Sequence, residues 1–318
     1  MDPQPLLVVA LGGNAMQDPR GDDSVASDLV RTARTAEHLV AIASSGWRLV
    51  ITHGNGPQVG NHLYRSELAH DEAGLPALPL DVCVADTQGG MGYVLQQALA
   101  NAFHARDIPA VVATVVTQVL VDDDDPAFKN PSKPIGEMIP APRIERLRNR
   151  GWVLVEDPRR GGWRRVVASP DPREIIEAEA ISTLIDRGIV VVASGGGGVP
   201  VRHAADGSLE GVPAVIDKDL ASSLLAVDLG ADGFMILTDV DNVIDNYGSD
   251  DERPLASISV DDARARLDAH EFPPGSMGPK LEALCRFAEV TGRLAVVTSI
   301  DRCEQALQGS AGTRVTVG

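Results

Sequence analysis

The sequence predicts an α/β protein with a mostly parallel sheet, helices on both faces of that sheet, and a small protruding insertion. Three observations support this fold class. Apolar runs of strand length alternate with amphipathic helical segments along most of the chain. The strand candidates are continuous apolar runs, which is typical of strands buried on both faces. Between residues 122 and 170 the alternation stops, and the chain becomes polar and rich in Pro and Arg.

The first part of the chain gives a regular series of elements. Leu6–Leu11 is an apolar run closed by two glycines, which predicts a buried strand. Gly46 follows an amphipathic stretch and marks the end of a helix. In order, we expect strand 6–11, helix 24–45, strand 48–52, helix 81–105 and strand 110–121.

The insertion, residues 122–170, holds two short strand candidates, 152–155 and 163–168. Its four consecutive aspartates, Asp122–Asp125, are interpreted as a solvated bend, because adjacent carboxylates rarely converge on one metal ion. The alternation then resumes. We expect helix 174–187, strand 189–193, helix 218–229, strand 233–238, helices 259–270 and 278–291, strand 294–298, and a terminal helix and strand.

Composition narrows the class of protein. A net charge of −17 over 318 residues excludes a general nucleic-acid binder, since such proteins neutralise phosphates with Lys and Arg. Cys83, Cys285 and Cys303 lack metal-binding spacing, which is typical of reduced thiols in a cytoplasmic protein, and Cys83 is interpreted as a core residue. No signal peptide is recognisable, and no apolar run approaches the roughly 20 residues that span a bilayer. We expect a soluble cytoplasmic protein without a membrane contact.

Lysine is used sparingly. Only four of the 28 basic residues are lysines. Lys129 is interpreted as a surface residue, whereas Lys133, Lys218 and Lys280 lie in segments shaped by Pro, Gly or Asp. Coding bias is one explanation; the other is that these sites need a compact ammonium group. Phosphoryl transfer needs positive charge and N–H donors around the transferring group, which three converging lysines would supply.

Glycine clusters follow three of the predicted strands: Gly12-Gly13-Asn14, Gly54-Asn55-Gly56 and Gly195–Gly198. In an open parallel sheet, ligands bind outside the carboxyl ends of the strands. Glycine there lets backbone N–H groups approach a phosphate closely. The clusters therefore indicate an anionic ligand. Walker A, dinucleotide-binding and protein-kinase signatures are absent from the sequence.

Other candidate residues keep two interpretations. In an extended segment Asp217 and Asp219 would share a face, whereas at a helix start Asp219 would point inward and orient the lysines. The alternative role of Lys218 is a salt bridge with these aspartates. The polar run 238–241 suits a nucleotide or a plain loop. His53 has two possible roles: it shapes its turn through a hydrogen bond to the backbone, or it is a catalytic group. The first role is at least as well supported as the second.

These motifs, taken in order, resemble those of the carbamate kinases, a branch of the amino acid kinase family. The resemblance runs through nearly the whole chain, and the Pro-Ser-Lys-Pro insertion motif separates this branch from related kinases. The matching segments are 10–15 (ALGGNA), 52–61 (THGNGPQVGN), 87–89 (TQG), 124–128 (DDPAF), 131–136 (PSKPIG), 195–201 (GGGGVPV), 216–219 (IDKD), 237–241 (LTDVD) and 274–280 (PGSMGPK).

The resemblance implies a three-layer αβα sandwich, residues 1–318, that forms a homodimer. It implies an acceptor half, about 1–215, a nucleotide half, about 216–318, and a lid formed by the insertion 122–170. ATP or ADP with Mg²⁺, and carbamate or carbamoyl phosphate, would be the small-molecule ligands.

The resemblance also assigns roles to residues. It makes Lys133, Lys218, Lys280 and Asp219 the catalytic set, with Arg165 as a lid arginine and no metal-ligating side chains. The acceptor and phosphoryl group would be held by Gly12, Gly13, Asn14, Gly54, Asn55 and Gly56. The nucleotide pocket would be lined by Thr238, Asp239, Tyr247, Met277 and Gly278.

Three functional hypotheses follow, of which the third is a related kinase that uses another small carboxylate as acceptor. The first is a carbamate kinase, which transfers a phosphoryl group reversibly between ATP and carbamate and would serve to make ATP in arginine catabolism. The second is a catalytically weak protein that binds carbamoyl phosphate or a nucleotide without turnover. Loss of one of the three lysines would favour the second hypothesis, and all three are present.

Overall fold

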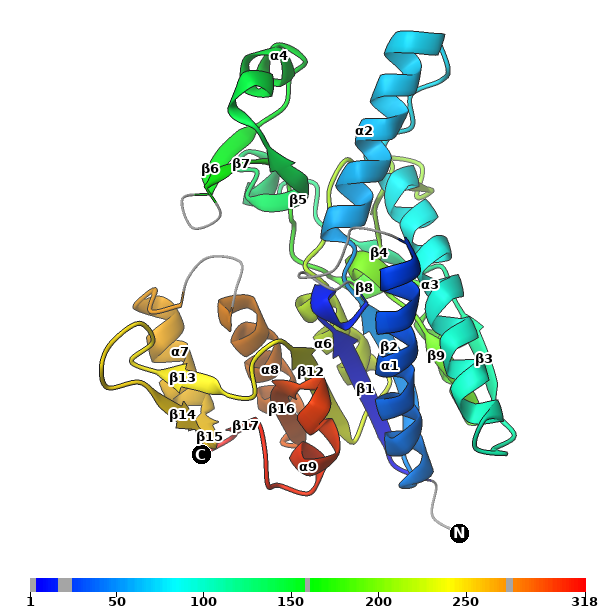
Figure 1. Cartoon of the computed structure of the whole chain (residues 1–318), viewed down its shortest axis with the longest axis vertical. Helices are drawn as coiled ribbons and strands as arrows, with labels where there is room; N and C mark the ends of the chain where they lie inside the picture. Colours follow the sequence, from blue (N-terminus) through cyan, green and yellow to red (C-terminus); the bar gives the residue numbers. More distant parts are fainter. Residues whose placement is uncertain (1–3, 17–24, 158–160, 273–276) are drawn as a thin grey trace.

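The computed structural model of the chain describes residues 4–16, 25–157, 161–272 and 277–318, with the side chain of Asn14 excepted. Its main sheet has eight strands, and every neighbouring pair is parallel except β16 and β17 (Figure 1). The strand order is β15 (Ser257–Ser259), β17 (Thr313–Thr316), β16 (Leu294–Ser299), β12 (Gly233–Thr238), β1 (Leu6–Leu11), β2 (Arg48–His53), β9 (Ile189–Val192) and β3 (Val111–Thr114).

Two hydrophobic cores lie on opposite faces of this sheet. Alternate residues of β1 belong to different cores, with Val8 and Ala10 in one and Val9 and Leu11 in the other. Because successive strand residues point to opposite faces, a strand with this pattern must be covered on both sides. The predicted three-layer αβα sandwich is confirmed.

Each core has its own helices. One face is covered by α1 (Val25–Ser44), α3 (Leu80–His104) and α9 (Cys303–Leu307). The other is covered by α5 (Ala178–Asp186), α6 (Lys218–Asp228), α7 (Val260–Asp268) and α8 (Met277–Thr291). No helix of the described segments combines the length and the apolar character that crossing a bilayer requires.

Two predictions from the sequence are wrong in this body. The expected strand 110–121 is two strands: β3 joins the main sheet, and β4 (Gln118–Leu120) joins a second sheet. That second sheet has the order β11 (Leu209–Gly211), β10 (Val199–His203), β4 and β8 (Glu174–Ile175). The expected helix 174–187 accordingly begins only at Ala178, because Glu174–Ile175 pairs as β8 with β4.

Within the insertion 122–170, the described residues 133–157 and 161–167 form a small lobe, and from here on the lid means residues 133–167. Its sheet has the order β5 (Lys133–Ile139), β7 (Gly162–Val167) and β6 (Leu154–Asp157), with the short helix α4 (Ile144–Asn149) beside it. In Figure 1 the lid projects from the body near helix α2 (Gly56–Ala73). Helix α2 is not among the helices predicted from the sequence.

The four aspartates before the lid are more than a solvated bend. Asp122 forms an ion pair with Arg173 at 2.6 Å, and Asp125 accepts a hydrogen bond from the backbone N–H of Asp171 at 2.9 Å. These contacts join the chain entering the lid to the chain leaving it. Among the described residues no cluster of side chains fit to hold a metal ion occurs, here or elsewhere.

Candidate functional site

The site lies where the three central strands β12, β1 and β2 end. These strands are parallel neighbours, so the residues that follow them come together at one edge of the sheet. The backbone N–H of Gly12, after β1, donates to Leu237 O at 2.8 Å. A Cβ on Gly12 would lie 2.9 Å from that oxygen, so no larger residue fits there. Gly13 opens on free space, as a loop that receives a ligand requires.

The loop after β2 is held in place by the glycine turn after β9. Asn55 is buried and donates its side-chain amide to Thr87 Oγ1 at 2.9 Å. A Cβ on Gly196 would lie 2.2 Å from the Asn55 amide nitrogen, and Gly196 has a φ of 67°. The turn at 195–198 therefore supports Asn55 from behind. Thr87 was recognised as part of a motif, but its role as the hydrogen-bond partner of Asn55 was missed.

Helix α6 starts at the same edge and presents Lys218 and Asp219. Both are buried, and their side chains form an ion pair. Asp217 is the N-cap of the helix, and its Oδ1 accepts from the backbone N–H of Asp219 at 2.9 Å. Of the two arrangements left open by the sequence, the structure has the helix start, with Asp219 pointing inward.

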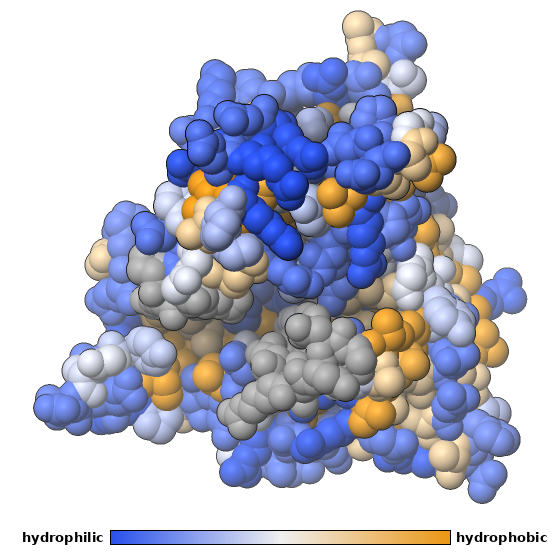
Figure 2. Space-filling view, turned by 45° about the horizontal axis from the view of Figure 1, so that its top comes forward, coloured by the Kyte–Doolittle hydropathy of each residue, from blue (hydrophilic) through white to orange (hydrophobic). Residues whose placement is uncertain are grey.

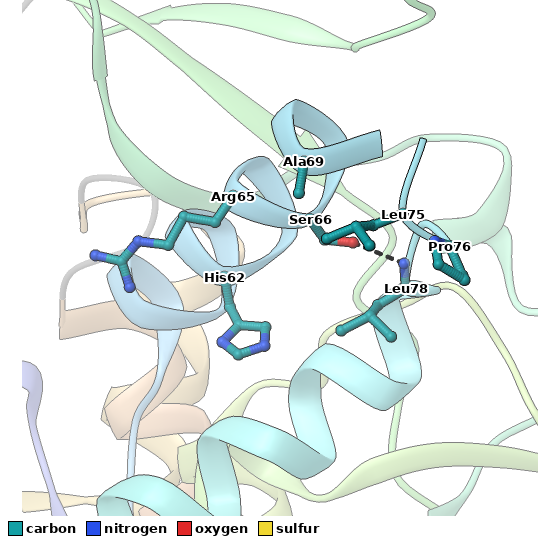
Figure 3. A pocket seen from close by; sticks show the side chains of 7 residues that line it. All are labelled: His62, Arg65, Ser66, Ala69, Leu75, Pro76 and Leu78. Atoms are coloured by element: carbon teal, nitrogen blue, oxygen red, sulfur yellow. Dashed lines mark hydrogen bonds between the residues drawn. The ribbon is translucent and has the colours of Figure 1, made fainter. Parts of the chain in front are cut away.

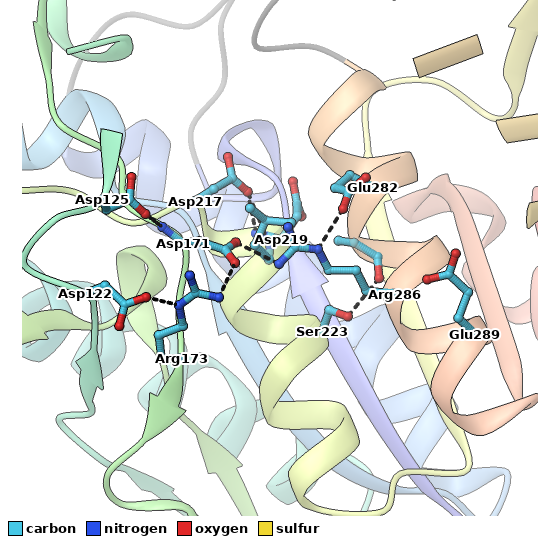
Figure 4. Close-up of polar contacts among 12 residues, drawn as sticks. Asp122, Asp125, Asp171, Arg173, Asp217, Asp219, Ser223, Glu282, Arg286 and Glu289 are labelled. Atoms are coloured by element: carbon cyan, nitrogen blue, oxygen red, sulfur yellow. Dashed lines mark hydrogen bonds and ion pairs between the residues drawn. The ribbon is translucent and has the colours of Figure 1, made fainter. Parts of the chain in front are cut away.

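Two distant lysines reach the same helix start. Lys280, in the first turn of α8, places Nζ 3.2 Å from Asp219 Oδ2. Lys133, the first residue of the lid, places Nζ 2.6 Å from Asp217 Oδ2. The structure thus brings together the three lysines singled out from the sequence, and adds Asp217, whose pairing with Lys133 sequence reasoning missed. Figure 4 shows Asp217 and Asp219 at the start of α6.

Burial and charge act against each other in this cluster. Burial raises the pKa of Asp217 and Asp219, but the nearby lysine charges outweigh it and hold both pKa values below the ordinary one. The charge of Asp219 raises the pKa of Lys280. Burial lowers the pKa of Lys218, against the pull of Asp219. The carboxylates therefore stay ionised, and the charge of Asp219 favours the protonated ammonium of Lys280.

The lysine cluster borders the glycine loop. A Cβ on Gly54 would lie 3.3 Å from the Lys218 side chain, and one on Gly56 would lie 3.6 Å from the carbonyl oxygen of Pro134, the residue after Lys133. The glycine loop and the ammonium groups are therefore neighbours, and N–H donors next to ammonium groups are what the equatorial oxygens of a transferring phosphoryl group require.

The predicted nucleotide residues are less closely grouped. Asp239, after β12, contributes to raising the pKa of Lys280, and Thr238 donates to Asp239 at 3.0 Å, so both lie at the cluster. Met277 and Gly278 are the first two residues of α8, and Lys280 follows in the same first turn. Tyr247 is 68% exposed in the turn between β13 (Val243–Asp245) and β14 (Arg253–Leu255), and no described contact joins it to the lysines. Residues 274–276 of the same motif lie outside the described residues.

Of the two roles left open for His53 by the sequence, the geometry fits the structural one. It is buried, and its Nδ1 lies 3.2 Å from the carbonyl oxygen of Gly54. Burial lowers the pKa of His53 to about 4. The neutral ring packs against Gly195, where a Cβ would approach Nε2 to 2.5 Å. A neutral, enclosed imidazole shapes the turn instead of exchanging protons with a substrate.

Ion pairs tie the foot of the lid to helix α8, which carries Lys280 (Figure 4). Asp171, just after the lid, pairs with Arg286 at 2.7 Å, and Arg286 pairs in turn with Glu282 at 2.7 Å. Asp171 also lies 3.4 Å from Arg173. The two chain segments that support the lid are thus linked to the helix that presents a second lysine of the cluster.

A hollow of about 520 Å³ lies elsewhere, along α2 and the loop that follows it (Figure 3). The Ser66 hydroxyl accepts from the Leu78 N–H there at 2.7 Å, which closes the loop onto the helix. Neither the glycine loops nor the lysines contribute to this hollow, so it is separate from the candidate phosphoryl site. Its lining is His62, Arg65, Ser66, Ala69, Leu75, Pro76 and Leu78.

Comparison with known proteins agrees with this geometry. The model of the amino acid kinase family matches residues 5–299. The carbamate kinase of Pyrococcus furiosus is 45% identical over 97% of this chain and 98% of its own length, and that of Thermococcus kodakarensis is 46% identical over 97% and 98%. The structure of carbamate kinase from Giardia lamblia bound to AMP-PNP has a TM-score of 0.90 and 41% identity, with both chains covered completely.

The chain therefore belongs to the amino acid kinase family and, within it, to the carbamate kinases. It is a phosphotransferase, and ATP or ADP is its nucleotide. The resemblance seen in the sequence motifs is confirmed.

Proposed function

We propose that the protein catalyses the reversible transfer of a phosphoryl group between ATP and carbamate, giving ADP and carbamoyl phosphate. The observation that carries the proposal is the convergence of Lys133, Lys218 and Lys280 on Asp217 and Asp219, next to the glycine loops. The carbamate kinases among its relatives support the choice of acceptor.

The chemistry requires little from the protein except charge and position. A carbamate oxygen forms the new bond to the γ-phosphorus, the bond from phosphorus to the β–γ bridging oxygen breaks, and ADP leaves with that electron pair. The attacking oxygen already carries negative charge, so no general base is needed. This agrees with the neutral, enclosed state of His53. The three lysines would stabilise the charge that spreads over the equatorial oxygens.

In this proposal each residue keeps the role that the family resemblance implies for it. Gly12, Gly13, Asn14 and the loop 54–56 hold carbamate and the transferring group, and Asp219 orients Lys218 and Lys280. The nucleotide enters with Mg²⁺ bound to its phosphates and is held by Thr238, Asp239, Tyr247, Met277 and Gly278. The acceptor would bind to the half formed by residues 1–215 and the nucleotide to residues 216–318.

The biological setting is proposed on the same basis. We infer a cytoplasmic homodimer that makes ATP from carbamoyl phosphate in arginine catabolism. Light scattering behind size-exclusion chromatography tests the dimer, for which a mass near twice 33.5 kDa is expected.

A coupled assay of ATP formed from ADP and carbamoyl phosphate tests the reaction. We expect robust activity in the wild type and a fall of at least about 100-fold in Lys133→Ala or Lys218→Ala, comparable to removing one transition-state donor. Lys129→Ala is the matched control, because Lys129 is exposed beside the lid and outside the cluster. Activity within a few-fold of the wild type in either cluster variant would remove that lysine from the catalytic set.

A further inference from the structure

One face of helix α2 is directed at the lid. Gly60, Tyr64, Glu67 and Asp71 are spaced so that they share a helix face, and each contacts the lid. A Cβ on Gly60 would lie 2.1 Å from the backbone nitrogen of Gly136, so the backbones of α2 and β5 are in direct contact. Asp71, at the other end of this face, forms an ion pair with a lid arginine.

Glu67 is the centre of this contact. Its Oε1 lies 2.8 Å from Arg165 Nη1, and its Oε2 accepts from Trp152 Nε1 at 2.9 Å. The Arg165 guanidinium also stacks on Trp152, 4.1 Å from the ring centroid. The three side chains close a ring of interactions in which both carboxylate oxygens are used. The arginine and the glutamate are only 18% and 24% exposed, so the pair is shielded from solvent more than an ordinary surface ion pair.

The lid core depends on the same helix. The cluster at its centre, as far as the structure describes it, consists of the buried side chains of Ile139, Leu147, Trp152 and Leu154, a set too small to stabilise an independent domain. Tyr64 of α2 packs against this core, with its ring 5.4 Å from that of Trp152 in an edge-to-face arrangement. Helix α2 therefore completes the lid core from outside the lid.

The end of α2 nearest the site carries the glycine loop, and the end of β5 nearest the site carries Lys133. Gly56 lies against Pro134, Gly60 against Gly136, and Asn61 donates to Glu137 at 2.7 Å. Helix and strand are thus in contact over several consecutive steps, starting at the site. This packing fixes the position of the Lys133 ammonium relative to the loop at residues 54–56.

We propose that α2 and the lid form one body, and that Gly60, Glu67, Trp152 and Arg165 act as positioning residues for Lys133. Lys133 is held over the glycine loop by the packing of α2 against β5. The lid arginine of the family resemblance, Arg165, acts through Glu67 and does not itself touch the substrate. This inference rests on the proposed function for the role of Lys133.

The test uses two variants that leave every substrate-contacting residue in place. Gly60→Ala forces a Cβ into the β5 backbone, and Glu67→Gln removes the charge at the centre of the ring. We expect kcat to fall at least about tenfold in each, since misplacement of about 1 Å can cost up to 100-fold. We expect KM for ADP to change less than twofold. Gly90→Ala, in open space on α3, and Glu72→Gln, exposed on α2, are the matched controls.

A double-mutant cycle separates positioning from general damage. If Glu67 acts through Lys133, Glu67→Gln costs nothing more once Lys133 is already Ala. An equal fold-loss in both backgrounds, or an unchanged kcat in both Gly60→Ala and Glu67→Gln, would overturn the proposal.

A second measurement does not depend on turnover. Two of the three tryptophans, Trp152 and Trp163, belong to the lid, so their fluorescence reports its contact with α2. We expect acrylamide to quench Glu67→Gln more strongly than the wild type or Glu72→Gln. Equal quenching would overturn the one-body arrangement even in a protein that fails to phosphorylate ADP, whereas that failure alone would overturn the proposed function.

Discussion

At the scale of single residues, His53 links the site to the stability of the fold. Its imidazole is buried and neutral, with its pKa lowered from 6.5 to about 4, mainly by burial. Between these two pH values the unfolded chain binds a proton that the folded chain does not. Protonation therefore favours unfolding, and the stability of the fold rises with pH across this range.

The expected effect is measurable. From pH 7 to pH 5, His53 should lower the free energy of unfolding by about 2 kcal/mol, at 1.36 kcal/mol for each pKa unit. Urea unfolding of the wild type and of His53→Gln at the two pH values isolates this share, because carboxylate titration is common to both. A loss on acidification as large in the variant as in the wild type would show that His53 does not carry it.

The sequence identifies the three lysines of the site but not the role of Asp217. Lys133, Lys218 and Lys280 were identifiable because each stands in a constrained segment of a chain that otherwise uses arginine. Asp217 was not, because its sequence neighbourhood leaves it equivalent to Asp219. Only the start of α6 distinguishes them, making one the N-cap and the partner of the lid and the other the inward carboxylate.

At the scale of elements, the glycine turn after β9 supports the loop at residues 54–56. Gly196 has a left-handed backbone conformation and lies against the Asn55 amide. Any side chain at residue 196 must displace Asn55 or the turn. The turn is therefore expected to affect substrate binding, although it does not itself need to touch the substrate.

Gly196→Ala tests this support. We expect a lower kcat/KM for carbamoyl phosphate, by at least about tenfold, because the variant displaces Asn55, which the proposed function assigns to binding the transferring group. Gly207→Ala is the matched control, since Gly207 also has a positive φ, 84°, but faces open space in the hairpin of β10 and β11. Both variants bear left-handed strain of roughly 1–2 kcal/mol. Equal kcat/KM values in the two would contradict the role of the turn.

Elements buried on both faces were predicted well, and those shared between two bodies were not. Strands 6–11 and 233–238 were predicted with their observed bounds, because full burial makes them continuous apolar runs. The structure gives helix α2 only three buried residues, Val59, Gly60 and Leu63, and its face toward the lid also carries the charged side chains of Glu67 and Asp71, so its sequence lacks a continuous apolar stripe. Its partners lie about 70 to 100 residues away in sequence, beyond the reach of local periodicity.

The prediction of a single strand over residues 110–121 is wrong for a different reason. Its apolar character is continuous, but the chain leaves one sheet and enters another inside it. The Gln88 side chain takes both backbone groups of Thr117 at this crossing, donating to its carbonyl oxygen at 3.0 Å and accepting from its N–H at 2.9 Å. A side chain of α3 thus replaces the strand ladder, and no pattern within the run reveals it.

At the scale of the whole molecule, charge is distributed unevenly. The chain carries a net charge of −17, whereas the lid, residues 133–167, has nine basic and only four acidic side chains. Figure 2 shows strongly hydrophilic surface gathered in the upper part of the view, on the side of the lid. Within the described segments, the exposed Arg143, Arg146 and Arg148 form no ion pair with a carboxylate. The lid is a cationic lobe on an acidic protein.

Such a lobe should attract anionic substrates that the rest of the surface repels. We expect Arg143→Gln, Arg146→Gln and Arg148→Gln together to lower kcat/KM for ADP several-fold at low ionic strength, with kcat unchanged, because steering affects association and not chemistry. The difference should vanish near 0.5 M salt, where the screening length falls to about 4 Å. Arg187→Gln, exposed before the amino end of β9 and so at the opposite edge of the sheet from the site, is the control and should change neither parameter. A deficit in the triple variant that persists at high salt would instead assign these arginines to the packing of the lid.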